Sequence, residues 1–186
     1  MKQLNRWFCV VASVSILLLG AEAGASEDAA SQQLEGVSLG AVGGYNPDLE
    51  APLLGVEGRF TFYAAPRVPL SIQPGFNYFF MGSSEFLGAT ARTTLLQFEV
   101  NALVNLELDA PVTPYAGVGP AMIYVQSSVS SSQGTWSSES NTDLGFNLLA
   151  GAAFELDGPL RPFGQFRVTF LEGNSMSLMV GLSYVL

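Results

Sequence analysis

The stretch LLQFEVNALVNLEL (residues 95–108) decides the fold, because its side chains alternate between two classes. From its second residue onward, every other side chain is apolar, and the intervening ones are polar apart from one leucine. The apolar set is Leu96, Phe98, Val100, Ala102, Val104, Leu106 and Leu108, and the other set is Gln97, Glu99, Asn101, Leu103, Asn105 and Glu107. This period of two predicts a β-strand whose two faces meet different surroundings.

The same alternation recurs between segments rich in turn-forming residues. We predict further strands at residues 37–45, 53–64, 70–80, 114–126, 143–156, 160–171 and 177–186. The pattern does not assign the two faces of residues 114–126, which contain two glycines and two prolines. An even number of strands, each about ten residues long, can close in a bilayer without an open edge. We therefore predict an all-β fold, an eight-stranded antiparallel up-and-down transmembrane β-barrel.

Connections between the predicted strands alternate in length. Residues 65–69, 109–113 and 157–159 are short and contain proline, residues 46–52, 82–91 and 127–142 are longer and polar, and residues 172–176 are a short exception. Short turns at one rim and long loops at the other are typical of outer-membrane barrels. With the N-terminus periplasmic, aromatic residues form two interfacial belts. The lower belt is Phe62, Phe154 and Tyr184, and the upper belt is Phe80, Phe146 and Phe170.

The N-terminus is typical of a secretory signal. Lys2 and Arg6 precede or flank an apolar run over residues 7–19, and small residues follow, so we expect cleavage after Ala23 or Ala25. Residues 1–25 are then the signal peptide, residues 26–34 a polar lead-in and residues 35–186 the barrel. The only cysteine, at position 9, lies within the signal, so the mature chain has no thiol chemistry.

The polar face identifies the inside of the barrel. An arginine facing lipid at the middle of a bilayer costs about 2–4 kcal/mol, so Glu57 and Arg59 must face the lumen while Phe60 and Phe62 face lipid. A soluble lipocalin-type ligand-binding barrel has the opposite arrangement, with its apolar face inside. Small uncharged residues dominate the polar face here, and only 12% of the chain is charged, against roughly 25% in soluble proteins, so we favour the membrane barrel.

Charged side chains recur on the predicted lumen face. They are Glu57, Arg59, Glu99, Glu107, Asp143, Glu155, Arg161 and Arg167. Charges in a lumen too narrow for bulk water must pair, so we expect a polar network that plugs the barrel. The alternative is a narrow conducting path, which would make the protein a small-solute or ion channel.

Composition excludes several kinds of chemistry. The chain has no histidine, so catalysis and zinc or copper sites that need an imidazole are excluded, and we expect no enzyme activity, no metal site and no cofactor. Removal of the signal leaves five arginines, fifteen carboxylates and no lysine, a formal charge of −10. Nucleic acid is therefore not an expected partner, whereas the lipid bilayer and lipopolysaccharide are.

Two segments, PYAGVG (residues 114–119) and GFNLLAGAAF (residues 145–154), resemble the fifth and sixth strands of OmpA/OmpX-type outer-membrane β-barrels. The last strand is similar to that family's sorting signal for the outer-membrane insertion machinery, through Gly181, Tyr184 and Leu186. It departs from that signal in ending on leucine and in having Met179 at a usually polar position. The resemblance does not extend to a periplasmic peptidoglycan-binding domain. It implies a non-enzymatic outer-membrane protein of a Gram-negative-type bacterium, acting in envelope integrity or surface interaction.

The connection over residues 127–142 is rich in serine and contains Gln133, Gly134 and Trp136. One hypothesis is that it continues the two flanking strands as a hairpin above the membrane, where an exposed strand edge recruits a surface partner. The other is a solvated loop with Trp136 packed back onto the upper belt.

Overall fold

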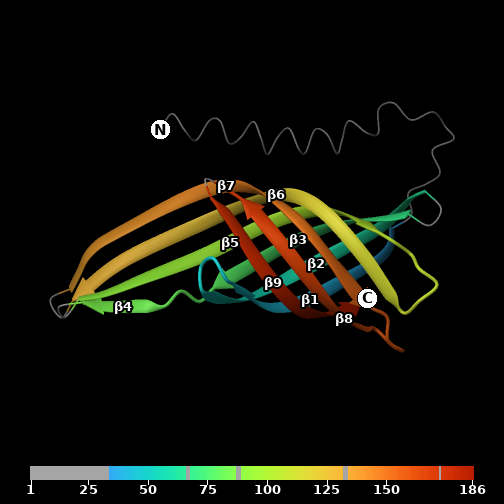
Figure 1. Ribbon diagram of the computed structural model, residues 1–186, viewed down its shortest axis with the longest axis horizontal. Helices are drawn as coiled ribbons and strands as arrows, with labels where there is room; N and C mark the ends of the chain where they lie inside the picture. The colour runs from blue at the N-terminus through green and yellow to red at the C-terminus, as the bar shows by residue number, and fades with distance from the viewer. Residues whose placement is uncertain (1–33, 66–67, 87–88, 132–133, 172) are drawn as a thin grey trace, which may run out of the picture. The chain divides into compact units, whose positions relative to one another are not determined.

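The computed structural model describes residues 34–65, 68–86, 89–131, 134–171 and 173–186, which form one antiparallel sheet (Figure 1). Its strands are β1 (Leu34–Asn46), β2 (Ala51–Ala65), β3 (Val68–Phe79), β4 (Ser83–Phe86), β5 (Ala89–Asn105), β6 (Val112–Ser131), β7 (Gly134–Phe154), β8 (Leu160–Phe170) and β9 (Asn174–Val185). The described residues contain no helix suited to crossing a membrane. The predicted signal peptide, most of the lead-in and Gln133 lie outside the described residues.

The sheet closes on itself. Neighbouring strands follow the order β3-β2-β1-β9-β8-β7-β6-β5, and β3 also pairs with β5. The first and last strands pair from Ser38 with Val185 to Tyr45 with Leu178, which closes the seam between the two ends of the barrel. The short strand β4 pairs only with β5 among the described residues, so it adds to the sheet without being part of the closed ring. The predicted eight-stranded up-and-down barrel is confirmed.

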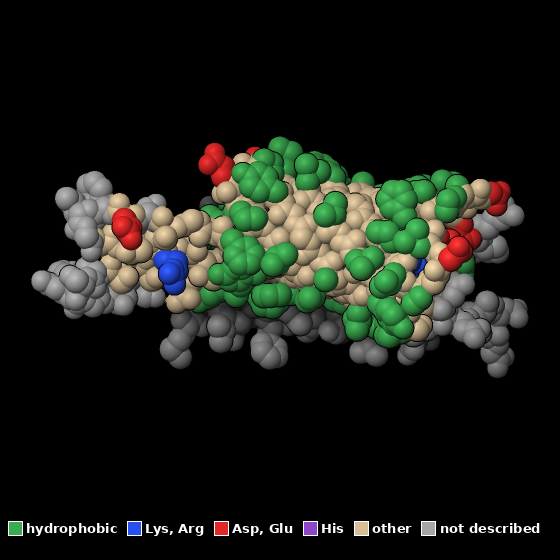
Figure 2. All heavy atoms as spheres, turned by 90° about the horizontal axis from the view of Figure 1, so that it is seen from below, with side chains coloured by type: hydrophobic (Ala, Val, Ile, Leu, Met, Phe, Trp, Pro, Cys, Tyr) green, Lys and Arg blue, Asp and Glu red, His purple; other side chains and the backbone are tan. Residues whose placement is uncertain are grey.

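The outside of the barrel is apolar. On β9, Leu178 and Val180 are 61% and 70% exposed, whereas Met179 between them is 3% exposed and faces the lumen. Figure 2 shows hydrophobic side chains spread over the outer surface of the barrel. A lipocalin-type barrel would bury these side chains inside, so the soluble alternative is wrong.

The lumen contains apolar layers as well as polar ones. Along β5 the buried Leu95 is followed by Gln97, Glu99 and Asn101, and then by the buried Leu103. The lumen is therefore less uniformly polar than the alternation predicted, because buried apolar side chains lie on either side of its polar centre. The main apolar members of this core are Val42, Leu53, Phe79, Leu95, Leu103, Tyr115, Ile123, Leu149, Phe163 and Met179.

The structure assigns the two faces of β6, which the sequence left open. Tyr115 and Ile123 are buried in the lumen, and Val118 and Met122 are exposed. The ring of Tyr115 lies over its cross-strand partner Gly151, where an added Cβ would come within 2.5 Å of Tyr115 Cζ. Over residues 114–126 the inward side chains of β6 are aromatic or apolar, or the residue is glycine. The sequence of this strand therefore does not alternate between polar and apolar residues.

Two predicted loops are partly strands. Residues 82–91 contain β4 and the start of β5, and residues 127–142 belong largely to β6 and β7, which pair as far as Ser131 with Gly134. The structure therefore supports the hairpin and not a loop, while recruitment of a surface partner stays a prediction; the side chain of Trp136 is outside what the structure describes. We call β4 together with residues 89–94, 125–131 and 134–145 the distal extension, which projects beyond the closed ring at the left of Figure 1.

Candidate functional site

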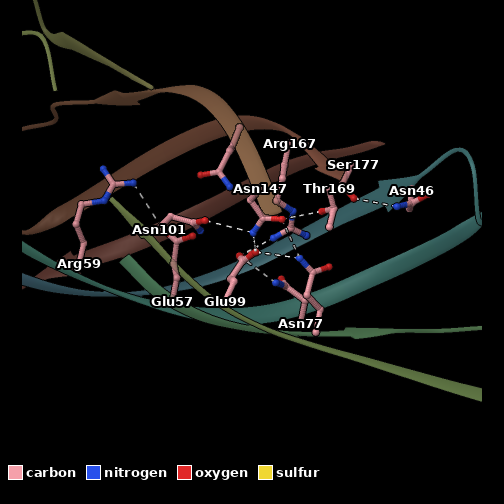
Figure 3. A network of polar contacts seen from close by, with 12 residues as sticks. Asn46, Glu57, Arg59, Asn77, Glu99, Asn101, Asn147, Arg167, Thr169 and Ser177 are labelled. Atoms are coloured by element: carbon pink, nitrogen blue, oxygen red, sulfur yellow. Dashed lines mark hydrogen bonds and ion pairs between the residues drawn. The ribbon is translucent and has the colours of Figure 1, made fainter. Parts of the chain in front are cut away.

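The centre of the lumen holds a buried ion pair. Arg167 of β8 donates from Nη1 to Glu99 Oε1 of β5 at 2.5 Å, and the two side chains are 0% and 6% exposed. Amide side chains complete the environment of the carboxylate: Asn147 Nδ2 donates to Glu99 Oε2 at 2.6 Å, Gln97 Nε2 to the same oxygen at 3.0 Å and Asn77 Nδ2 to Oε1 at 3.3 Å (Figure 3). Glu99 thus accepts hydrogen bonds from one charged donor and three neutral donors.

Further hydrogen bonds add other residues of β5 and β8 to this cluster. Thr169 Oγ1 donates to Asn147 Oδ1 at 2.8 Å, and Asn147 Nδ2 also lies 3.2 Å from Asn101 Oδ1. Three buried nitrogens of this cluster, Asn101 Nδ2 and Arg167 Nε and Nη2, have no hydrogen-bond partner within the described protein. Buried polar atoms normally find a partner, so these nitrogens are the natural attachment points for water in the lumen.

A second pair lies on β2. Glu57 Oε1 is 3.7 Å from Arg59 Nη2, and the Arg59 guanidinium stacks 4.4 Å above the centre of the Tyr115 ring. Stacking on an aromatic face stabilises a guanidinium cation. This pair therefore holds its arginine by two contacts, one of which does not depend on the carboxylate.

The remaining predicted lumen charges do not join the central cluster. Glu107, Glu155 and Arg161 line an open cavity of about 430 Å³ at the end of the barrel that carries the N-terminus of β1, together with Arg59 and Tyr63. There Glu107 accepts a hydrogen bond from Tyr63 Oη, and Glu155 accepts one from Thr113 Oγ1 at 3.1 Å. The prediction of a single network over all eight charges is therefore wrong, because the strands carry these charges to different depths of the barrel.

Asp143 lies at the opposite end of the barrel, in the distal extension. Both of its carboxylate oxygens accept from Asn141 Nδ2, at 2.9 and 3.0 Å. On this strand, β7, residues 134–145 pair with β6 but have no partner on their other side, because pairing with β8 begins only at Phe146. The backbone groups on that side form an open sheet edge in the described structure.

The C-terminal motif residues occupy different environments. Tyr184 is half exposed on the outside, and the Leu186 backbone donates to Val37 O at 2.9 Å, which ties the last residue to β1. Gly181 faces the lumen under the ring of Phe163, where a Cβ would lie 2.3 Å from Phe163 Cζ. Glycine is therefore required at this position by packing inside the barrel.

Sequence reasoning missed several contributors to the polar centre. Asn147 and Thr169 were not singled out, although each occupies an inward position on its strand. An asparagine between Phe146 and Leu148 within GFNLLAGAAF was the available signal, because an amide on the lumen face of a tight barrel needs partners there. Among the described residues, no group of three or more Asp, Glu, His or Cys side chains is placed to hold a metal ion.

Comparison with known proteins agrees with this geometry. A family model described as the outer membrane protein beta-barrel domain matches residues 11–184. No curated protein matches the sequence.

Solved structures show the same fold at low identity. Ail, the attachment invasion locus protein of Yersinia pestis, is 16% identical, with 81% of this chain and 97% of Ail covered and a TM-score of 0.57. The N-terminal β-barrel domain of Pseudomonas aeruginosa OprF is 14% identical, with 83% of this chain and 100% of that domain covered and a TM-score of 0.58. A major outer membrane protein of Thermus thermophilus is 14% identical, with 81% of this chain and 99% of that protein covered and a TM-score of 0.59.

Proposed function

Because the chain belongs to the outer membrane protein β-barrel family and so is a protein of the outer membrane, we propose that it is a non-enzymatic barrel that supports envelope integrity and presents a binding edge at the cell surface. In this proposal the closed ring serves as the membrane anchor. The distal extension serves as the interaction surface.

The anchor role rests on the filled lumen. The Glu99–Arg167 pair and its amide partners occupy the centre, with Leu95 and Leu103 packed on either side along β5. Such an arrangement leaves the barrel closed to flow, as expected for eight strands, whose interior is just wide enough for side chains. In this role the closed ring holds the protein in the outer membrane and does not transport a solute.

The interaction role rests on one observation, the unpaired edge of β7 over residues 134–145 in the described structure. An open edge adds an extended segment of another chain by backbone hydrogen bonds. The extension is wide enough to be rigid, since β4, β5, β6 and β7 pair side by side across it. If the short turns and the termini are periplasmic, this edge lies outside the cell.

A shortened hairpin tests the proposal. Gln126 and Ser140 are direct cross-strand partners, so replacing residues 127–139 with an Asn-Gly turn closes the hairpin near the rim. We expect this variant to keep heat-modifiable migration on gels and to restore detergent resistance to a deletion strain, while losing surface binding of extended peptides. Equal peptide binding by the full-length and shortened chains would refute the interaction role, and no rescue by either would refute the anchor role.

The second candidate is a narrow channel. It is favoured by the cavity of about 430 Å³ at the terminal end and by the unpartnered nitrogens of Asn101 and Arg167 within the described protein, which together suggest a partial path for water. Steady, reproducible single-channel conductance in planar bilayers would support this candidate over the closed anchor. We expect none for the wild-type chain.

Polyanionic ligands are not expected at the extension. Ail has been crystallised with sucrose octasulfate, a heparin analogue. In the described part of this extension Arg92 is the only basic residue, against the acidic Glu85, Glu139 and Asp143. A shared fold with Ail therefore does not transfer an affinity for sulfated sugars to this chain.

A further inference from the structure

Building on the surface-interaction role proposed above, we propose that the free edge of β7 selects an extended polypeptide segment with basic side chains four residues apart on one face. Two features of the extension support this selectivity: the edge is open, and the charges beside it are negative. The same charges would repel a second copy of this chain.

The edge is long and contains neither proline nor lysine. Within the described structure, twelve residues, 134–145, have a strand neighbour on one side only. Natural edge strands are commonly protected by proline, by charged side chains, by bulges or by a covering segment. Residues 134–145 contain no proline and no lysine, and what protection they have comes from Glu139, Asp143 and the bulge at position 136. In this hairpin Val129 pairs with Ser137 and Ser130 pairs with Thr135, so the extra residue, at position 136, lies on β7. The regular part of the β7 edge, which carries the argument, therefore runs over residues 137–145.

Two acidic residues lie on one face of this edge. Cross-strand partners share a face, so Glu139 opposite Ser127, Asn141 opposite Val125 and Asp143 opposite Ile123 all continue the lumen side of the sheet. Glu139 and Asn141 are exposed, and Asp143 is partly exposed. Residues four apart on a strand are separated by about 13 Å, so the two carboxylates present a spaced pair of negative charges to an added strand.

Among the described residues, no basic side chain compensates these carboxylates on their own face. The inward positions of the neighbouring strands carry Thr93, Leu95, Val125 and Ser127, all of them uncharged. The single arginine of the described extension, Arg92, pairs in register with Ser83 and Ser128 on the opposite face, the one that continues the lipid side. The edge therefore retains a net negative field on the lumen-side face alone.

This charge distribution also determines the partner. Pairing of two copies through their β7 edges would bring carboxylates against carboxylates, and like charges directly opposite destabilise a strand pair. An added strand with lysine or arginine opposite Glu139 and Asp143 gains two favourable cross-strand pairs instead. The other face of the partner would meet Ser140 and Thr142, which suit threonine and valine.

The test uses three nine-residue synthetic peptides of alternating threonine and valine. One is neutral, one has two lysines four residues apart on one face, and one has glutamates at the same positions. Their binding to the full chain in nanodiscs is measured by fluorescence anisotropy. We expect the lysine peptide to bind about two- to thirtyfold more tightly than the neutral peptide, the range given by two cross-strand charge pairs, and this advantage to shrink in high salt.

Matched variants locate the effect. The double variant Glu139→Gln/Asp143→Asn should lose the advantage of the lysine peptide while still binding the neutral peptide. Asp109→Asn/Asp157→Asn makes the same change in net charge in exposed turns at the other end of the barrel and should behave as wild type. Heat-modifiable migration of each variant reports that the barrel is folded.

The possible outcomes separate this inference from the proposed function. Equal binding of all three peptides to the wild type, with loss of all binding in the shortened hairpin, would overturn the charge selectivity and leave strand addition intact. No binding of any peptide to the wild type, or undiminished binding to the shortened hairpin, would overturn both. Loss of lysine selectivity in the Asp109→Asn/Asp157→Asn control would also overturn the inference, because overall charge would then explain it.

Discussion

Substitution of Glu99 by glutamine should destabilise the barrel more than removal of its partner arginine. Glu99→Gln keeps the size of the side chain but leaves the guanidinium of Arg167, which is 0% exposed, without a counter-charge. Breaking a buried ion pair in this way costs about 3–5 kcal/mol. Arg167→Met leaves a carboxylate that still accepts hydrogen bonds from Asn77, Gln97 and Asn147, so we expect a smaller loss of about 1–3 kcal/mol.

The double variant Glu99→Gln/Arg167→Met removes both charges together. Its loss of unfolding free energy should be smaller than the sum of the two single losses by more than about 1 kcal/mol, because neither charge is left alone in the lumen. Glu57→Gln is a matched control, since it makes the same chemical change beside Arg59, whose guanidinium also stacks on Tyr115. It should cost less than Glu99→Gln.

Reversible urea unfolding in phosphatidylcholine vesicles measures these differences, with circular dichroism and the heat-dependent shift on denaturing gels as the two readouts. The reasoning would be refuted by a loss below about 1 kcal/mol for Glu99→Gln, or by additive losses in the double variant. Either result would mean that water or another side chain replaces the carboxylate at no significant cost.

Three further predictions concern packing inside the barrel, contact with lipid and the hydrogen bond between the β1–β2 turn and β9. Gly181→Val should lower the yield of folded barrel in refolding assays, because Phe163 fills the space above it, and Phe163→Ala should partly restore the yield in the double variant. Val180→Arg, at the most exposed lipid-facing position of β9, should lower the unfolding free energy in vesicles by about 2–4 kcal/mol if it lies near the bilayer centre. Asp48→Asn should loosen the β1–β2 turn from β9, since Asp48 Oδ2 accepts from Met176 N at 2.6 Å, and hydrogen exchange at Met176 should rise by about fivefold or more.

Alternation in the sequence was sufficient to predict the closed ring. On β5 the environment changes at every residue between lumen and lipid, so the period of two is recorded directly in residues 95–108. On β6 the lumen side is filled by Tyr115 and by glycines that allow neighbouring side chains to approach, such as Gly117 under Leu103. Both faces of that strand are then apolar or small, and the pattern cannot distinguish them.

The sequence did not predict which lumen side chains of distant strands contact one another. Glu99 and Arg167 are 68 residues apart and lie on β5 and β8, which are not neighbours in the sheet. Which lumen charges meet depends on the tilt of the strands and the stagger of their register, and neither is recorded in the alternation of a single strand. For this reason the charges were predicted as one set, although Glu107 and Asp143 are at opposite ends of the barrel.

The length of β6 and β7 argues that the extension is used. These strands have 20 and 21 residues, whereas about ten cross a membrane. Ordering each additional residue costs about 1–2 kcal/mol of conformational entropy, and an isolated two-stranded hairpin is at best marginally stable in water. The membrane requires none of these residues, and beyond the rim they have no apolar core to stabilise them. What orders them is continuity with the barrel strands and the lateral pairing of β4 and β5, so the barrel serves as the template that holds an exposed edge rigid. A pre-ordered edge removes part of the entropic cost of adding a strand, which is the advantage a binding surface gains from being built on a closed barrel.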